Sequence, residues 1–172
     1  MKDATVLILP DWQGSGPEHW QMHWVRHHGA MLVEQDDWLR PRRGDWLARL
    51  DEVVIDTPGD LFLVAQGLGC LLVAAWAAFS LHTARVRGAL LVAPIDVESH
   101  DMKNSCPGWV PVLRAPLPFA STVVGPINDP SDHAQGLASN WGSNWIESVQ
   151  VAPFGADSYL NGWPQGRKLL QT

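Results

Sequence analysis

The sequence is poor in cysteine and tyrosine and has no long apolar run. Two cysteines, Cys70 and Cys106, are too few for a disulfide framework and lack the spacing of metal ligands. No apolar stretch reaches the roughly 18 residues of a membrane span, and the first residues lack the pattern of a secretory signal. We therefore expect a cytoplasmic protein that does not contact a membrane.

Positive charge is also scarce. The chain of 172 residues has 12 Lys and Arg against 18 Asp and Glu, which gives a net charge of −6. The basic residues are scattered apart from the short run at Arg40–Arg43. A nucleic-acid partner is not expected, because neutralising phosphates requires a basic stripe. The length fits one domain over residues 1–172, and the sequence leaves open whether it is a monomer or a dimer.

Tryptophan is the residue that the sequence has in excess. Ten Trp stand against one Tyr and four Phe, and they are spread along the whole chain. Each indole combines a large apolar face with an N–H group that needs a partner. We expect most of them in the core and two or three at a pocket.

Short apolar segments alternate with helical patterns along the chain. Strands are expected at residues 4–9, 31–34, 61–65, 88–93, 122–125 and 148–151. Helices are expected at residues 18–28, 45–55, 69–80, 132–140 and 162–170. The alternation predicts an α/β fold of three layers with a mostly parallel sheet of about five to six strands. In such folds the site lies at the carboxyl ends of the strands, here residues 10–16, 66–69 and 128–133.

The segment Leu61–Cys70 has the pattern of a nucleophile elbow. An apolar strand runs into a glycine turn and then into an alanine-rich helix. In a G-x-S-x-G elbow this turn lifts a serine above the sheet. At the position of that serine the chain has Gly67.

Several motifs carry a family resemblance that covers nearly the whole chain in order. They include Leu9-Pro-x-Trp-Gln-Gly-Ser-Gly-Pro-x-His-Trp20, Val64-Ala-x-x-Leu-Gly-Cys70, Gly88-Ala-Leu-Leu-Val-Ala-Pro-x-Asp-Val-Glu98, Asn128-Asp-Pro130 and Gly162-Trp-Pro-x-Gly166. With them the chain resembles the small α/β-hydrolase-fold serine hydrolases of the retinoblastoma-binding-protein and bacterial YdeN-like type. The resemblance implies a compact α/β-hydrolase core without a large cap domain.

The chain departs from this family pattern at the catalytic positions. Gln66 and Gly67 stand where the family has His and the nucleophilic Ser, and Asp11 replaces a usual Gly in the oxyanion-hole loop. The acid of the triad corresponds to Asp129, which is present, whereas residues 151–158 have no counterpart of the catalytic His. The triad mechanism needs an oxygen nucleophile and an imidazole that takes its proton. We therefore expect a degenerate triad.

Possible substitute nucleophiles and metal ligands have plainer structural roles. Cys106 could be exposed in the irregular segment, but no base is evident beside it. A loop that leads into a helix capped by Asp132 accounts for Ser131 and His133 without a catalytic role. One expected helix carries three histidines, His19, His23 and His27. Their spacing of four residues could place them on one face, where they could bind a metal. The family resemblance implies no metal there, and we expect neither a metal nor a cofactor.

The remaining candidates define a pocket above the sheet. The candidate catalytic residues are Asp11, Gln66 and Asp129, and the candidate substrate-binding residues are Trp12, Gly67, Leu68 and His133. Two carboxylates in one poorly solvated pocket have pKa values that are pushed apart, which separates acid and base roles. The plainer interpretation is that Asp129 caps a loop and Asp11 is a turn residue facing water.

Three functions remain open. The first is noncovalent acid–base catalysis on a small apolar molecule, such as cyclisation, isomerisation, elimination or dehydration, with Asp11 leading and Gln66 donating a hydrogen bond. The second is a noncatalytic pseudohydrolase that binds a small molecule or a protein. The third is a residual esterase-type hydrolase in which a carboxylate activates water.

Overall fold

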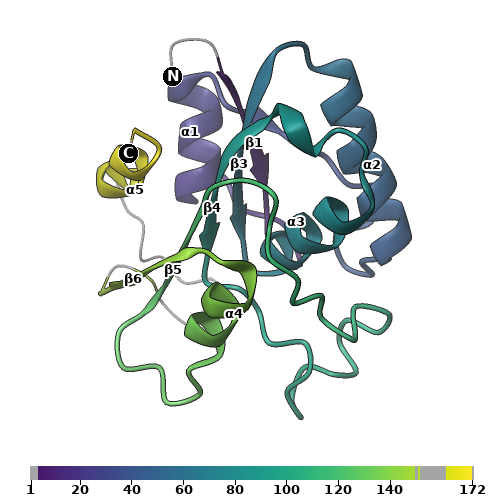
Figure 1. Ribbon diagram of the computed structural model, residues 1–172, viewed down its shortest axis with the longest axis vertical. Helices are drawn as coiled ribbons and strands as arrows, with labels where there is room; N and C mark the ends of the chain where they lie inside the picture. The colour runs from purple at the N-terminus through teal and green to yellow at the C-terminus, as the bar shows by residue number, and fades with distance from the viewer. Residues whose placement is uncertain (1–3, 150, 152–161, 172) are drawn as a thin grey trace.

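The computed structural model describes residues 4–149, 151 and 162–171. Its strands are β1 (Ala4–Leu9), β2 (Met31–Leu32), β3 (Asp60–Gln66), β4 (Val86–Val92), β5 (Ser121–Pro126) and β6 (Asn144–Ser148). Its helices are α1 (Trp20–His28), α2 (Arg43–Asp56), α3 (Leu68–Phe79), α4 (His133–Trp141) and α5 (Pro164–Leu169), with a 3₁₀ turn η1 (Thr83–Arg85). The strands form one six-stranded sheet in the order β2-β1-β3-β4-β5-β6, and every pairing is parallel (Figure 1).

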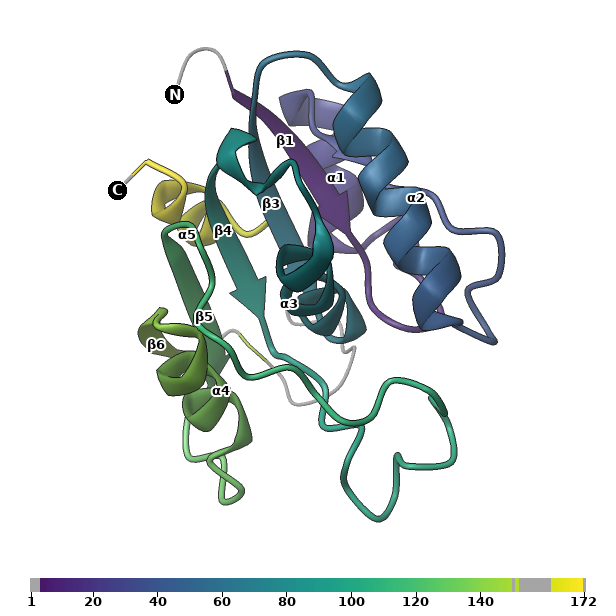
Figure 2. The same ribbon diagram turned by 45° about the vertical axis from the view of Figure 1, so that its right-hand side comes forward.

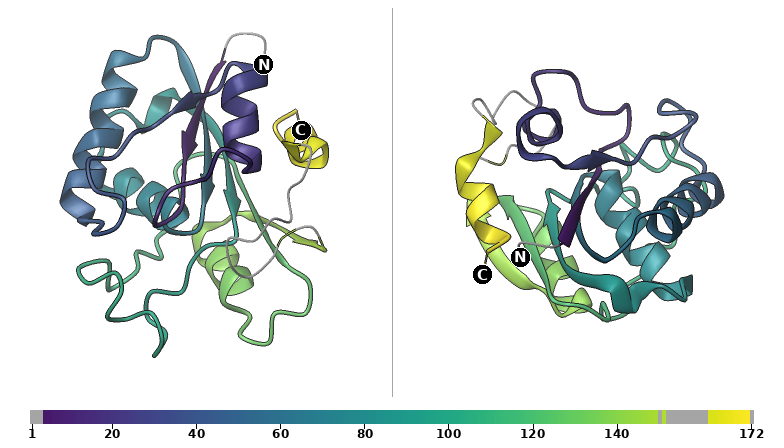
Figure 3. Two further views of the ribbon diagram at one scale, coloured as in Figure 1. Left: turned by 180° about the vertical axis from the view of Figure 1, so that it is seen from behind. Right: turned by 90° about the horizontal axis from the view of Figure 1, so that it is seen from above.

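Helices cover both faces of this sheet. Helices α2, α3 and α4 enclose one core cluster with Trp46, Trp76 and Trp141, whereas α1 and α5 border a second cluster with Trp20 and Trp24. Figure 2 and the view from above in Figure 3 show α1 and α5 on the face opposite α2 and α3. The three-layer α/β fold is confirmed, and the described residues form no large cap domain. No helix in this part of the chain is long and apolar enough to cross a membrane.

Strand β3 and helix α3 form the centre of the molecule. β3 pairs with β1 and β4, and residues 63–76 are buried without interruption. A strand that is covered on both faces must be apolar on both faces, which explains the continuous run Leu61–Ala65. The expected order of elements is therefore found, with most boundaries shifted by one or two residues.

The last strand is the main difference from the sequence-based prediction. The prediction places it at residues 148–151, but β6 spans Asn144–Ser148 and pairs Trp145 with Val123. The Trp145 ring lies so close to Gly125 that a Cβ there would come within 2.3 Å of it. This indole packing sets the position of β6, and a short alternating pattern does not reveal it. The helix expected at 162–170 is shorter and begins at Pro164.

The irregular segment after β4 is anchored in the core. Trp109 donates from Nε1 to the Pro41 carbonyl at 2.9 Å and packs edge-on against Trp46, with ring centroids 5.6 Å apart. Cys106, which the sequence left as a residue that could be exposed, is fully buried. The apolar residues of this segment hold it against the core and place its first residues, Pro94–Asp96, beside the carboxyl end of the sheet.

Candidate functional site

The turn between β3 and α3 is the centre of the site. Gly67 has φ 55° and ψ −117°, a conformation that a residue without Cβ adopts at least cost. Its N–H donates to the Val92 carbonyl at 3.0 Å, which ties the turn to β4. The next N–H group, that of Leu68, belongs to the first turn of α3 and has no partner within the helix.

The Asp11 carboxylate supplies the missing acceptor. Its Oδ1 accepts hydrogen bonds from the backbone N–H of Leu68 and from that of Trp12, both at 2.7 Å. A Cβ built on Gly67 would lie 1.9 Å from Cγ of Asp11 and 2.1 Å from each of its oxygens. The carboxylate of Asp11 therefore fills the space that any side chain at position 67 would need.

The two N–H donors correspond to those of an oxyanion hole. In α/β-hydrolase folds that hole is formed by the N–H of the residue after the nucleophile and by an N–H from another strand-end loop. Here Leu68 follows the elbow position and Trp12 lies in the loop after β1, and both donate to the same oxygen of Asp11. A substrate carbonyl could reach these donors only by displacing the carboxylate.

The environment of Asp11 changes its acidity. Burial raises the pKa of Asp11 from its ordinary value of 3.8 to about 6, although the hydrogen bonds from Leu68 and Trp12 act in the opposite direction. No hydrogen bond to Oδ2 is found within the described residues. Asp11 is thus a carboxyl group that gains and loses a proton close to neutral pH.

Asp11 lines a pocket of about 160 Å³ at the carboxyl end of the sheet, which we call the Asp11 pocket. Its polar lining residues are Asp11, Asp96, Asp129, Ser131 and His133. Its apolar lining residues are Ala93, Pro94, Ile95, Pro126 and Ala134. The pocket therefore combines an apolar surface with three carboxyl groups and one imidazole.

The loop between β5 and α4 places Asp129 and His133 at this pocket. Oδ1 of Asp129 accepts from the N–H and the hydroxyl of Ser131, at 2.9 and 2.7 Å. Nε2 of His133 lies 3.1 Å from the Ile95 carbonyl, and Nδ1 lies 3.8 Å from Oδ2 of Asp96. Asp129 consequently orders its loop and also faces the pocket. Asp132 precedes the helix without a side-chain capping bond, so the expected cap is absent.

The structure brings together only part of the candidate set. Asp11, Asp129 and His133 share the pocket, and Gly67 and Leu68 form the turn against Asp11. The side chain of Gln66 is buried elsewhere, where Oε1 accepts from Trp20 Nε1 at 2.8 Å. Trp12 is partly buried against the core, and its Nε1 donates to the Leu39 carbonyl at 3.0 Å. Neither of these two side chains is among those that line the Asp11 pocket.

Asp96 is a pocket residue that the sequence pattern did not single out. It lies shortly after the end of β4, in the motif Gly88–Glu98. The rule that sites lie at carboxyl ends of parallel strands applies to this strand as well. Asp96 did not stand out in the sequence, because it begins a long irregular segment that contains many polar residues.

The cysteines are unsuited to act as nucleophiles. Cys70 is buried with Sγ 3.4 Å from the Val92 carbonyl, and burial raises its pKa well above the ordinary range. Burial also raises the pKa of Cys106 to about 11. A thiol must ionise to attack, so both cysteines remain unreactive at neutral pH.

The histidines of α1 are not arranged as a metal site. Nδ1 of His19 accepts from the Gln21 N–H at 3.2 Å at the start of the helix, whereas the ring of His23 packs against that of His27. Throughout the described ranges no group of three or more His, Cys, Asp or Glu side chains could hold a metal ion.

Several solved structures are similar to this chain along almost its entire length. A protein described as a YdeN-like hydrolase from Pectobacterium atrosepticum is 21% identical over 98% of this chain and 89% of its own, with a TM-score of 0.81. The ydeN gene product of B. subtilis is 18% identical over 98% and 97%, with a TM-score of 0.70. MGS-MChE2, an α/β-hydrolase enzyme from the metagenome of lagoon sediments, is 11% identical over 98% and 89%, with a TM-score of 0.65.

These three structures share the fold of the chain. A comparison with curated proteins finds no match. The family model described as serine hydrolase matches residues 6–172, almost the entire sequence. The chain therefore belongs to the serine hydrolase family and has an α/β-hydrolase fold.

Proposed function

We propose that this member of the family has lost the Ser-His-Asp mechanism and uses Asp11 for noncovalent acid–base catalysis on a small molecule. The proposal is carried by one observation. The carboxylate of Asp11 lies against Gly67 and accepts both N–H groups of the oxyanion-hole position. The Asp11 carboxylate thus stands where the family pattern has the nucleophilic side chain, and its Oδ1 occupies the oxyanion position in front of the two N–H donors.

Two further observations argue against hydrolysis through a covalent intermediate. Gly67 offers no side chain, and His133 is the histidine that lines the Asp11 pocket. The His133 imidazole faces the Ile95 carbonyl and Asp96 and makes no hydrogen bond to a hydroxyl group among the described residues. The Ser131 hydroxyl at the pocket donates to Asp129 and not to an imidazole, so the Ser–His proton transfer that starts acyl-enzyme formation lacks its base.

Asp11 is suited to move a proton instead. A group with a pKa near the working pH is the most effective general acid or base, and Asp11 has a pKa of about 6. The N–H groups of Leu68 and Trp12 hold Oδ1, which leaves Oδ2 to take a proton from one substrate atom and return it to another. His133 and Asp129 are the second proton-carrying groups. Isomerisation, elimination, dehydration and cyclisation all need such a transfer and no acyl intermediate.

The pocket also restricts the substrate. A cavity of about 150 Å³ in another protein holds benzene, so the Asp11 pocket of about 160 Å³ suits a molecule of similar size. Its carboxyl groups repel an anion, and its apolar surface favours a hydrocarbon part. We propose a small, mostly apolar and uncharged substrate with one acidified C–H or O–H bond.

Proton exchange tests this proposal before the natural substrate is known. The protein is incubated in D₂O with a panel of small enolisable ketones, and ¹H NMR follows deuterium incorporation next to the carbonyl. We expect the wild type to accelerate exchange for some of them. The variant Asp11→Asn keeps the shape of the side chain but cannot accept the proton, so the enhancement should fall at least about 100-fold.

Asp101→Asn is the matched control, because Asp101 is exposed and lies outside the Asp11 pocket. It should keep the wild-type rate. If compounds bind in the Asp11 pocket but the wild type and Asp11→Asn exchange protons equally, the protein is a binding protein and the catalytic proposal is wrong.

A further inference from the structure

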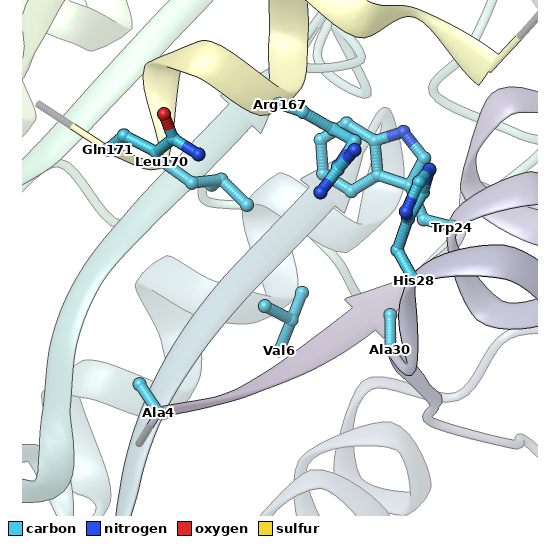
Figure 4. Close-up of a pocket in the computed structure, with 8 residues that line it drawn as sticks. All are labelled: Ala4, Val6, Trp24, His28, Ala30, Arg167, Leu170 and Gln171. Atoms are coloured by element: carbon cyan, nitrogen blue, oxygen red, sulfur yellow. The ribbon is translucent and has the colours of Figure 1, made fainter. Parts of the chain in front are cut away.

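A second pocket lies at the amino end of β1, away from Asp11. Its volume is about 540 Å³, within the range of roughly 300–1,000 Å³ that is usual for small-molecule sites. It shares no lining residue with the Asp11 pocket. We call it the Arg167 pocket, and its lining residues are Ala4, Val6, Trp24, His28, Ala30, Arg167, Leu170 and Gln171 (Figure 4).

The Arg167 pocket has an apolar floor and a polar edge. Val6 and Ala4 lie along β1 at the bottom of the view in Figure 4, and Leu170 points inward above them. Arg167 and His28 lie together beside Trp24. The arrangement suits a ligand with a hydrocarbon part and a polar head.

The charged side chains that the structure describes on the pocket lining and on its two helices are all basic. The Arg167 guanidinium makes no ion pair or hydrogen bond within the described residues, and none of the described lining residues is acidic. The last turn of α1 carries Arg26, His27 and His28, the last turn of α5 carries Arg167 and Lys168, and neither helix contains an acidic residue. A helix C-terminus has about half a negative charge, which these basic side chains outweigh.

His28 contributes a donor rather than a second full charge. Burial and the nearby Arg167 guanidinium lower the pKa of His28, with smaller effects from His23 and His27. The ring is therefore neutral at neutral pH and keeps one N–H donor. Gln171 offers a further amide donor at the edge, and Arg167 is the fixed positive charge.

We propose that the Arg167 pocket binds a small amphiphile with a carboxylate head. The planar guanidinium matches the two oxygens of a carboxylate, and the tail would lie on Ala4, Val6 and Trp24. This site is independent of the proposed acid–base function. The two pockets differ in the charge of the ligand that they favour, because the Asp11 pocket repels anions and the Arg167 pocket attracts them.

Titration with octanoate, octanol and octylamine tests the proposal, because the three compounds share one chain and differ in charge. We expect octanoate to bind saturably, with ¹⁵N NMR shifts at Ala4, Val6, Ala30 and the Trp24 indole N–H. Octanol should bind more weakly, and octylamine should not bind. Arg167→Gln should weaken octanoate binding at least about tenfold and leave octanol binding unchanged.

Two control variants establish whether octanoate binds at this pocket and through its charge. Arg42→Gln removes an exposed charge outside the pocket and should leave octanoate binding unchanged. Asp11→Asn should also leave it unchanged, which distinguishes failure here from failure of the catalytic proposal. The inference is wrong if octanoate and octanol bind equally, if Arg167→Gln has no effect, if the shifts map to Leu68 and its neighbours, or if no compound saturates.

Discussion

At the scale of single residues, Asp11 and Gly67 depend on each other. The carboxylate needs the empty space of a glycine, because any Cβ at position 67 would lie about 2 Å from it. In turn, Asp11 gives the Leu68 N–H its acceptor. A serine introduced at position 67 by itself would therefore overlap with Asp11 and would not stand free as a nucleophile.

A double-mutant cycle measures this dependence. Gly67→Ser should lower the free energy of unfolding by about 2 kcal/mol or more, because the side chain overlaps with Asp11. Adding Asp11→Gly should recover part of that loss, so the two changes should not be additive. Urea denaturation of the wild type, the two single variants and the double variant gives the coupling free energy between the two positions. Additive effects would show that the two side chains do not compete for one space.

The raised pKa of Asp11 predicts how stability depends on pH. The folded protein holds this proton more tightly than the unfolded chain, whose pKa is 3.8. The resulting stabilisation is complete below pH 3.8 and is lost as the pH rises to about 6. Above that pH the buried carboxylate lowers the free energy of unfolding by an amount on the order of 2–3 kcal/mol.

Asp11→Asn removes that destabilisation. The stability of the variant relative to wild type should therefore increase by about 2–3 kcal/mol between pH 4 and pH 8. Urea denaturation at both pH values measures it, with Asp101→Asn as the control. A constant difference between variant and wild type would contradict a raised pKa.

At the scale of the elements, tryptophan packing fixes positions that the chain pattern leaves open. Trp109 anchors the segment after β4 through Pro41 and Trp46, and Trp145 over Gly125 fixes β6 against β5. Strands and helices with a clear periodicity were predicted from the sequence. The position of β6 was not, because it depends on a contact between two strands.

Gly125→Ala tests that contact. The added methyl would lie 2.3 Å from the Trp145 ring, so we expect a loss of about 1–3 kcal/mol and faster amide exchange in β6 than in β1. Gly44→Ala is the matched control, since a Cβ there meets nothing within 4 Å. It should be neutral or slightly stabilising. If the two changes had equal effects, the packing of Trp145 over Gly125 would not be what fixes the position of β6 against β5.

At the scale of the whole molecule, the sheet separates two chemical environments. The carboxyl end holds the acidic Asp11 pocket, and the amino end of β1 holds the basic Arg167 pocket. The sequence predicted the layers, the parallel sheet and the strand ends that form the Asp11 pocket. The family resemblance implied that Asp11 lies in the oxyanion-hole loop, and its carboxylate accepts the N–H groups of Trp12 and Leu68.

The sequence did not predict the direction of the Gln66 side chain. Its acceptor role toward Trp20 joins residues 46 positions apart, and only the folded packing of α1 on the sheet creates it. The Arg167 pocket was missed for the same reason, because its walls come from β1, α1 and α5. Side-chain partnerships between distant elements are therefore what the pattern of residues along the chain does not reveal.

The central claim is that a carboxyl group poised near neutral pH has replaced the nucleophile at the elbow. It is tested most directly by ¹³C NMR titration of the side-chain carboxyl groups, with the Asp11 signal assigned by its loss in Asp11→Asn. We predict a titration midpoint at about pH 6 for the Asp11 carboxyl signal. The amide signal of Leu68, which donates to Asp11, should change with the same midpoint. A midpoint at or below the ordinary 3.8 would contradict this claim.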